Sequence, residues 1–335
     1  MTPGYPGVLI PEHRLALDAA RPGYTTLVSH GHGDHVPYDP AEAMGTWKPS
    51  LADIWCTPET EDIIRTRYSD TPRPHLRSVP YGEPFEVNGC RITFRSAGHI
   101  LGSALIHVEC PEGSVLYTGD FKAHEALTCP SMDPAPADVL ITETTFGLPI
   151  FLWEEPEALR NQIVDFAKEA LEDGATPVFL AYGLGKGQEV VKTLGEGGID
   201  VALHGAVRSM CDVYERHGYT FPRATPYEKE TLEGKALVCP PGSRTNPMVT
   251  KLKSYRTAYV SGWASLANRR QQMDADGLIA LSDHADYKGL IDLVEAVSPR
   301  KVFTVHGYTE PFAEVLRKRG LDAEPLMKEE SRGEE

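Results

Sequence analysis

The segment SHGHGDH, residues 29–35, places three histidines and one aspartate within six consecutive positions. Imidazole and carboxylate groups are ligands that suit zinc and related divalent ions. In a tight loop, His30 and His32 can face one side while Asp34 and His35 face another, so one segment can supply two neighbouring metal sites. The alternative is a solvated turn, but such a cluster arises by chance in roughly one chain in a thousand. The segment therefore predicts metal binding.

Three further candidate ligands follow strand-like stretches: His99 in AGHILGS, Asp120 in YTGDF and His306 in TVHGY. Taken singly, each has a structural alternative, namely a buried core histidine, a turn cap and a packed strand end. Residues at strand ends lie in loops at one rim of a sheet, where a rigid scaffold directs several ligands to one point. We therefore expect these side chains to join the first cluster. The early strand-like stretches are residues 24–29, 90–96, 104–110, 114–118 and 139–142.

A different pattern begins near Trp153. Pro156 suits a first helical position and Gly174 a helix C-terminus, with apolar residues at helical spacing between them. Strand-like and helix-like segments then alternate, which predicts a parallel α/β unit. They are residues 177–181, 186–194, 199–203 and 207–216. Residues 262–276 are polar and predict a loop, after which the earlier pattern returns with a helix over 287–297.

The composition is that of a soluble globular protein. The formal charge of −15 argues against a broad basic surface for nucleic acid, although bound divalent cations would outweigh it locally. No stretch approaches the ~20 apolar residues of a membrane helix, and the N-terminus lacks a signal-peptide pattern. We therefore expect a cytoplasmic protein that contacts no membrane. The six cysteines are scattered, and we expect them to be reduced and mostly buried.

Together these motifs resemble the metallo-β-lactamase superfamily, and two more resemble its β-CASP nuclease branch. Those two are Glu143 in TETTFG and His284 in LSDHADY. The resemblance covers nearly the whole chain and implies an αββα sandwich of mixed α/β class with an inserted α/β domain. The expected parts are residues 1–152 (metallo-β-lactamase domain), 153–275 (β-CASP insertion) and 276–335 (return to the first domain).

The resemblance implies two divalent metal ions, zinc by preference and manganese as the alternative. One ion would be held by His30, His32, His99 and Asp120, and the other by Asp34, His35, His306 and the same Asp120 as a bridge. Asp18 matches an aspartate that supports the histidine loop in the family, with an ordinary exposed or capping aspartate as the alternative. Gly33 departs from the residue that relatives often carry there, but it removes no ligand.

Besides Asp34 and Asp120, the expected catalytic residues are His284 and Glu143. His284 would protonate the leaving oxygen, because histidine carries a proton near neutral pH and a nearby carboxylate such as Glu143 raises its pKa. Phosphate contacts are expected from Lys186, which follows a glycine-rich turn, and from Ser243 and Arg244 in a second loop. A plain strand-to-helix turn is the alternative reading for the first of these segments.

The implied activity is hydrolysis of phosphodiester bonds. The stretches TETTFGLPIFLW and AYGLGKGQE are most similar to bacterial exonucleases associated with DNA ligases, which implies repair of DNA ends or single strands beside a ligase or helicase system. A β-CASP ribonuclease in RNA processing is the main alternative. A thioester or lactam hydrolase would need neither the insertion nor the extra histidine. An inactive scaffold would have lost ligands, and none is missing here.

Overall fold

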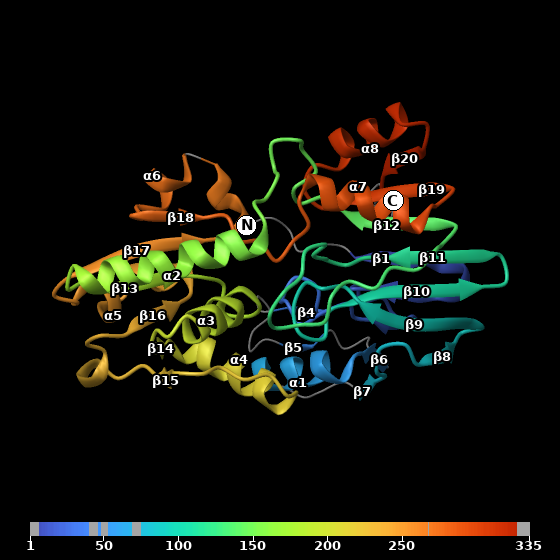
Figure 1. The fold of residues 1–335 in the computed structure, drawn as a ribbon. Coiled ribbons are helices and arrows are strands. Elements are labelled where there is room, and N and C mark those ends of the chain that lie inside the picture. Colours follow the sequence, from blue (N-terminus) through green and yellow to red (C-terminus); the bar gives the residue numbers. More distant parts are fainter. Residues whose placement is uncertain (1–6, 40–45, 48–52, 69–74, 267, 327–335) are drawn as a thin grey trace, which may run out of the picture.

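The computed structural model describes residues 7–39, 46–47, 53–68, 75–266 and 268–326, which form three main β-sheets with helices packed on them (Figure 1). The first sheet has the strand order β1-β2-β3-β6-β7. Its strands are β1 (Val8–Ile10), β2 (Leu15–Leu17), β3 (Thr25–Leu27), β6 (Asp53–Cys56) and β7 (His75–Ser78). The short strands β4 (Tyr38–Asp39) and β5 (Thr46–Trp47) pair with each other.

The second sheet has seven strands in the order β20-β19-β12-β11-β10-β9-β8. Its strands come from both ends of the chain: β8 (Pro84–Val87), β9 (Cys90–Ser96), β10 (Ala104–Cys110), β11 (Gly113–Tyr117), β12 (Val139–Glu143), β19 (Lys301–Val305) and β20 (Asp322–Pro325). Strands β8 to β11 pair antiparallel, whereas β11, β12, β19 and β20 pair in parallel. The C-terminal part of the chain therefore completes the N-terminal domain.

These two sheets pack face to face around a buried core, with Leu17 and Leu27 from the first sheet and Phe94 and Tyr117 from the second. The outer face of the second sheet is covered by α7 (Tyr287–Val297) and α8 (Thr309–Lys318), which bury leucines and Phe312 against it. Helix α1 (Pro58–Arg67) packs on the first sheet. The layers are thus helix, sheet, sheet and helix, as the resemblance implies (Figure 1).

The third sheet is all parallel, with the order β15-β14-β16-β13-β17-β18. Its strands are β13 (Thr176–Leu180), β14 (Val201–Leu203), β15 (Ala224–Pro226), β16 (Ala236–Cys239), β17 (Tyr255–Val260) and β18 (Gly277–Ile279). The predicted parallel α/β unit is therefore confirmed. Strand β18 still belongs to this sheet, just past the expected end of the insertion at residue 275.

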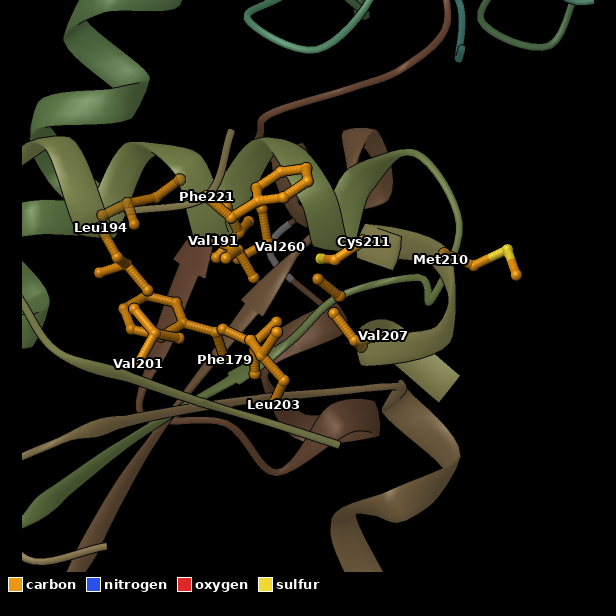
Figure 2. Close-up of a cluster of buried hydrophobic side chains, with 14 of the residues drawn as sticks. Phe179, Val191, Leu194, Val201, Leu203, Val207, Met210, Cys211, Phe221 and Val260 are labelled. Atoms are coloured by element: carbon orange, nitrogen blue, oxygen red, sulfur yellow. The ribbon is translucent and has the colours of Figure 1, made fainter. Parts of the chain in front are cut away.

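Three helices cover one face of the third sheet: α2 (Pro156–Glu172), α3 (Lys186–Glu196) and α4 (Gly205–Arg216). Figure 2 shows part of this core, where Phe179 of the sheet lies among side chains of α3 and α4. Ile63, Ile100 and Leu101 of the metallo-β-lactamase-like part are buried in the same cluster, so the two units share one core. The opposite face is covered partly by α5 (Pro247–Thr250).

The expected loop over residues 262–276 is wrong in part. It contains a 3-10 helix, η4 (Gly262–Ser265), and a short helix, α6 (Arg269–Met273). The side chain of Ser261 caps η4 by accepting a hydrogen bond from the backbone N–H of Trp263. One helical turn is too short to show hydrophobic periodicity, so the sequence pattern could not reveal these helices. The other 3-10 helices are η1 (Pro11–His13), η2 (Lys229–Thr231) and η3 (Pro241–Thr245).

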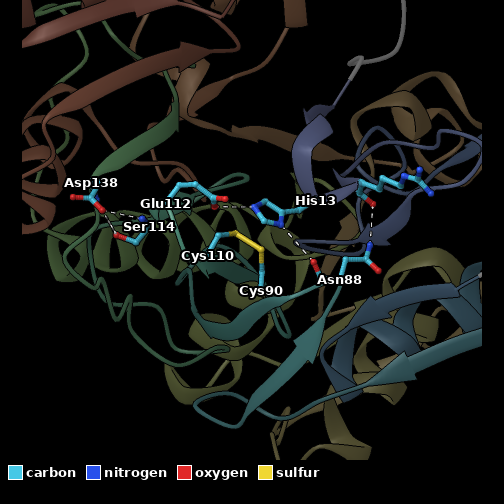
Figure 3. The surroundings of a disulfide bond; sticks show 8 residues. His13, Asn88, Cys90, Cys110, Glu112, Ser114 and Asp138 are labelled. Carbon is cyan, nitrogen blue, oxygen red and sulfur yellow. Dashed lines mark hydrogen bonds and ion pairs between the residues drawn. A yellow bond between two sulfur atoms is a disulfide. The ribbon is translucent and has the colours of Figure 1, made fainter.

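The expectation that all six cysteines are reduced is also wrong, because Cys90 and Cys110 form a disulfide (Figure 3). Cys90 begins β9 and Cys110 ends β10, and the pairing of Arg91 with Glu109 places the two cysteines opposite each other, with Cα atoms 4.5 Å apart. Their separation of 20 residues carries no sign of this hairpin register. The other four cysteines are free and buried, as expected.

Candidate metal centre and active site

The candidate ligands meet at one edge of the second sheet. Strands β9, β11, β12 and β19 point the same way, because β11, β12 and β19 pair in parallel and β10 is antiparallel to both β9 and β11. Their carboxyl ends therefore share an edge, and His99, Asp120, Glu143 and His306 lie at or just after those ends. The loop of residues 29–35 leaves β3 and brings its histidines to Asp120 at the same edge.

The first group of metal donors consists of His30, His32, His99 and Asp120, whose ligand atoms all lie within 4.8 Å of one another. Oδ2 of Asp120 is 3.6 Å from Nε2 of His30 and 3.8 Å from Nε2 of His99. Burial holds the pKa of both histidines well below the ordinary value, and neighbouring imidazoles lower it further. Neutral imidazoles offer the lone pair that a metal ligand needs.

The hydrogen bonds of His32 and His99 indicate which ring nitrogens carry those lone pairs. Nε2 of His32 lies 3.2 Å from the carbonyl oxygen of Leu184, and Nδ1 of His99 lies 2.8 Å from that of Asp283. A carbonyl oxygen only accepts, so these nitrogens carry the protons of the neutral rings. Nδ1 of His32 and Nε2 of His99 are then both acceptors, although only 3.1 Å separates them. Two lone pairs this close repel unless a cation binds both, which fits a metal.

Ser29 fixes which ring nitrogen of His30 carries the lone pair. The hydroxyl of Ser29 donates its only proton to Oδ2 of Asp18 at 2.6 Å, so at 2.9 Å it accepts a hydrogen bond from Nδ1 of His30. Nε2 of His30 is then an acceptor, and it lies 3.1 Å from Nδ1 of His32. Three imidazole lone pairs and one carboxylate thus converge, a donor set that suits zinc or a related divalent ion.

The second group consists of His35, His306 and the shared Asp120. Nε2 of His35 lies 3.4 Å from Oδ2 of Asp120. The imidazole rings of His35 and His306 stack with their centroids 5.3 Å apart. Asp34, the fourth expected ligand, stands at the rim: its side chain is 63% exposed, and its Oδ2 lies 3.9 Å from Nε2 of His35. It lines the same cavity but lies outside the tight group.

Asp18 lies beneath the histidine loop. Its Oδ1 accepts a hydrogen bond from the backbone N–H of Ser29 at 2.6 Å, and its Oδ2 accepts from the Tyr117 hydroxyl at 2.9 Å and from Nδ1 of His35 at 2.7 Å. The backbone of Gly119, which lies close to Asp18 and Ser29, is also constrained. Gly119 has φ +52°, and an added Cβ would lie 2.4 Å from Oγ of Ser29, so only glycine fits before Asp120.

Glu143 and His284 face each other across the two halves of the chain. Nδ1 of His284 is 3.0 Å from both carboxylate oxygens of Glu143, and Oε1 of Glu143 also accepts a hydrogen bond from the backbone N–H of Phe121 at 2.8 Å. Burial alone would lower the pKa of His284, but Glu143 and Asp120 raise it to about 9. This shift favours the protonated ring at neutral pH.

Both donor groups open into a cavity of about 350 Å³. Its walls come from the metallo-β-lactamase-like part and from the inserted domain, and they include the aromatic residues Phe146, Tyr182 and Trp263. Lys186 also lines it and forms an ion pair with Asp283, with Nζ 2.6 Å from Oδ1. Burial lowers the pKa of Lys186, although Asp283 opposes this shift.

The structure does not bring all expected phosphate contacts together. Among the described residues of η3, Pro241 lines the cavity, whereas Ser243 and Arg244 do not. Arg244 instead pairs with Asp274. The glycine-rich turn before α3 uses its own amides: the N–H of Gly185 donates to the side chain of Gln188, and that of Gly187 donates to the carbonyl oxygen of Tyr182. The N–H groups of Gly185 and Gly187 are therefore already used within the turn.

Sequence reasoning missed a buried ion pair beside the site. Nζ of Lys122, two residues after Asp120, lies 2.8 Å from Oε2 of Glu189 in α3, and Arg160 of α2 approaches the same carboxylate at 3.5 Å. It also missed Tyr182, Trp263 and Asp283. For Asp283 a signal existed, since it precedes His284, but the others depend on side chains from distant segments meeting in space.

Two known protein families match segments of this chain. Residues 5–155 match the family described as "Beta-lactamase superfamily domain", and residues 278–324 match the "Zn-dependent metallo-hydrolase RNA specificity domain". The chain belongs to the metallo-β-lactamase superfamily. These matches lie on either side of most of the inserted domain, and together with the three-sheet architecture they confirm the expected fold class.

Relatives of this metallo-β-lactamase-fold chain include nucleases. It is 35% identical over 319 residues to a probable DNA ligase of Opitutus terrae, covering 95% of this chain and 30% of that protein. It is 28% identical over 182 residues to an RNase J-like protein of Methanocaldococcus jannaschii, covering 49% of this chain and 42% of that one. The chain thus spans less than half the length of these relatives.

A solved structure of a protein of unknown function from Enterococcus faecalis V583 has a TM-score of 0.63 and 14% identity, covers 92% of this chain and 81% of its own, and supports the fold alone. The expected family, the metallo-β-lactamase superfamily with β-CASP nucleases among its relatives, is confirmed, and the relatives include both DNA- and RNA-related proteins. Among the described residues, no helix of this superfamily member is long and apolar enough to cross a bilayer.

Proposed function

We propose that the chain is a two-metal phosphodiesterase that degrades DNA from an end and prefers single strands. The observation that carries this proposal is the meeting of two donor groups, joined by Asp120, with the His284–Glu143 pair in one cavity. A thioester or lactam hydrolase has no evident use for a protonated histidine supplied from beyond an inserted domain. An acid at this position suits a leaving alkoxide, which must gain a proton.

Divalent ions held by the two groups would supply a bound water of lowered pKa and neutralise charge on the phosphoryl oxygens. The chain's own residues perform the remaining tasks. His30, His32, His99 and Asp120 would hold one ion, and Asp34, His35 and His306 would share Asp120 to hold the other. Asp18 fixes the orientation of His35 and, through Ser29, that of His30. A carboxylate or carbonyl that fixes the second ring nitrogen also strengthens the ligand.

His284 is the proposed general acid. Both oxygens of Glu143 face its Nδ1, so Nε2 is the nitrogen from which a proton can pass to the leaving oxygen. The raised pKa keeps the ring charged at neutral pH, and a positioned acid of this kind contributes about 100- to 10,000-fold to turnover. Lys186 is the proposed phosphate contact in the cavity wall, where Asp283 holds its ammonium. We assign Ser243 and Arg244 no role in this cavity.

DNA is favoured as the substrate because the relative that aligns with 95% of this chain is named a probable DNA ligase. The access route agrees, since a cavity walled by two domains admits a thin strand end more readily than a duplex. Because that relative is named a probable DNA ligase, we also propose that the chain acts in the cytoplasm beside a ligase or helicase repair system. The second candidate is an RNA-processing nuclease, which the RNA specificity domain at residues 278–324 and the RNase J-like relative favour.

A time course on matched oligonucleotides tests the proposal. Linear and circular single strands of DNA and RNA, with duplex DNA alongside, are incubated with and without chelator. We expect chelator-sensitive loss of linear single-stranded DNA and persistence of circles. Faster loss of RNA would establish the second candidate instead, and rapid cutting of circles would make the protein an endonuclease.

Two variants separate acid chemistry from metal binding. His284→Ala should keep its metal and lose about 100- to 10,000-fold in turnover, whereas Asp120→Ala should lose metal and activity together. Metal content is measured on each purified variant. If His284→Ala is purified without metal, His284 is a ligand and the assignment of the acid is wrong.

A further inference from the structure

A second cavity, of about 400 Å³, adjoins the metal-lined one. It lies between α1 and α4, so one wall comes from the metallo-β-lactamase domain and the other from the inserted domain. Its size falls in the range of sites that hold a small organic ligand. The lining residues that matter here are Arg67, Tyr182 and Met210.

Tyr182 connects the two cavities because its side chain lines both. It is 64% exposed, unusual for a large aromatic ring, and its ring meets that of His32 edge-on with centroids 5.9 Å apart. Its backbone is fixed by the turn that follows. The N–H of Gly187 donates to the carbonyl oxygen of Tyr182 at 2.8 Å, and a Cβ at Gly187 would lie equally close to that oxygen. The turn thus holds a flat ring in solvent beside a metal ligand.

The walls of the second cavity are apolar on one side and cationic on the other. Met210 of α4 is buried at the edge of the insertion core, and Figure 2 shows its side chain pointing away from the other labelled residues. Opposite it, Arg67 of α1 is exposed and donates one hydrogen bond to the carbonyl oxygen of Gly31, 2.8 Å away, within the histidine loop. A guanidinium has five N–H donors, so this bond leaves capacity for a phosphate.

The two walls are held at a fixed spacing. Asp62 of α1 accepts hydrogen bonds from Nε and Nη2 of Arg216, at 2.9 and 3.0 Å, and lies 3.2 Å from Nε2 of His217. Hydrogen bonds from Arg216, aided by its charge, lower the pKa of Asp62 even though partial burial opposes this. This ion pair and the burial of Ile63 of α1 in the insertion core together set the spacing of the two walls.

We propose that this second cavity binds one nucleotide of the substrate strand, next to the phosphate being cleaved. The base stacks on Tyr182, and the phosphate on its far side contacts Arg67. Stacking on an aromatic ring tolerates any base, because every base has a π face, so the site sets affinity for a single strand without selecting sequence. The inference rests on the proposed nuclease function and adds the place where the strand lies beyond the metal-lined cavity.

The test measures binding of a fluorescently labelled single-stranded DNA by anisotropy, in the His284→Ala background so that cleavage is slow. Tyr182→Ala should raise the dissociation constant about tenfold, which is the loss of affinity expected for one base–aromatic stack. Tyr182→Phe should bind as the parent does. Tyr255→Ala is the matched control. Tyr255 is an exposed tyrosine of β17, and among the described residues it lines neither cavity.

Strands with a single abasic residue, walked along the sequence, locate the contact. At one position the abasic strand should bind the parent about tenfold more weakly, and there Tyr182→Ala should cause no further loss. Cleavage by the chain with native His284 is measured in parallel. Binding that depends on Tyr182 without cleavage would overturn the proposed function alone. Cleavage with equal binding by Tyr182→Ala, Tyr255→Ala and the parent would overturn this inference alone, and absence of any strand binding would overturn both.

Discussion

Replacing Glu189 by glutamine should destabilise the protein by about 4 kcal/mol. The carboxylate lies in α3 of the inserted domain, and its partner Lys122 lies in the loop after β11, so the pair joins the two units. Both side chains are almost fully buried, at 2% and 3% exposure. At 2.8 Å, two unit charges attract by about 6 kcal/mol at an effective dielectric constant of 20. A neutral amide still accepts a hydrogen bond from the ammonium, which restores about 2 kcal/mol.

The remaining loss of about 4 kcal/mol agrees with the ~3–5 kcal/mol that is typical when one partner of a buried pair is removed. Urea unfolding, followed by circular dichroism and tryptophan fluorescence, measures it. With a slope near ~3 kcal/mol per molar urea, the midpoint should fall by about 1–1.5 M. The matched control is Asp292→Asn, which breaks the exposed pair with Lys288 in α7 and should change stability by less than ~0.5 kcal/mol.

A double variant, Lys122→Met with Glu189→Leu, should recover most of the loss, because both charges of the buried Lys122–Glu189 pair are then absent. The reasoning is refuted if Glu189→Gln unfolds within about 0.3 M urea of the parent. It is also refuted if the double variant is less stable than Glu189→Gln. The first outcome would mean that water reaches Lys122 and that the pair carries little energy, and the second that the apolar replacements pack worse than the charged side chains.

Four further predictions follow from the site and the core. Elemental analysis should find about two divalent ions per chain, and Asp34→Ala should lower this to about one, because Asp34 stands apart from the tight group of His30, His32, His99 and Asp120; retention of both ions would remove Asp34 from the ligand set. Gly119→Ala should cost about 1–3 kcal/mol more than Gly218→Ala, because both positions have positive φ but only the first meets Ser29; equal unfolding midpoints would contradict this. Asp18→Asn should weaken metal affinity about 10- to 100-fold relative to the parent chain, measured by competition with a chelator. Thiol titration of the denatured, unreduced chain should detect four cysteines, and six would restore the all-reduced expectation.

Much of the site was predictable because its residues cluster along the chain or follow strands. The SHGHGDH loop holds four of the expected ligands within one turn, and short-range geometry limits where they can point. His99, Asp120 and His306 were predictable only as a set, since each alone has an ordinary structural explanation. The parallel direction of β11, β12 and β19 brings two of them to one edge, and β9 brings the third.

The prediction was weakest where contacts are long-range. Arg244 pairs with Asp274, away from the metal-lined cavity, and the amides of Gly185 and Gly187 are used within their own turn. Neither outcome is visible in residue type, because a cationic loop and a glycine-rich turn suit phosphate whenever they are free to meet it. The disulfide between Cys90 and Cys110 was missed for a related reason, since it depends on hairpin register.

The amino-acid sequence by itself determined the periodicities that build each sheet and helix, the metal-binding residue types and their order along the chain. Those features depend on local geometry, which a sequence carries directly. The tertiary structure alone decided that His284 meets Glu143 across 141 residues, that Lys122 is buried against Glu189, and that Tyr182 stands between two cavities. Such contacts depend on how sheets and helices from distant segments pack, and the packing free energy is shared among many side chains, so no single motif records it.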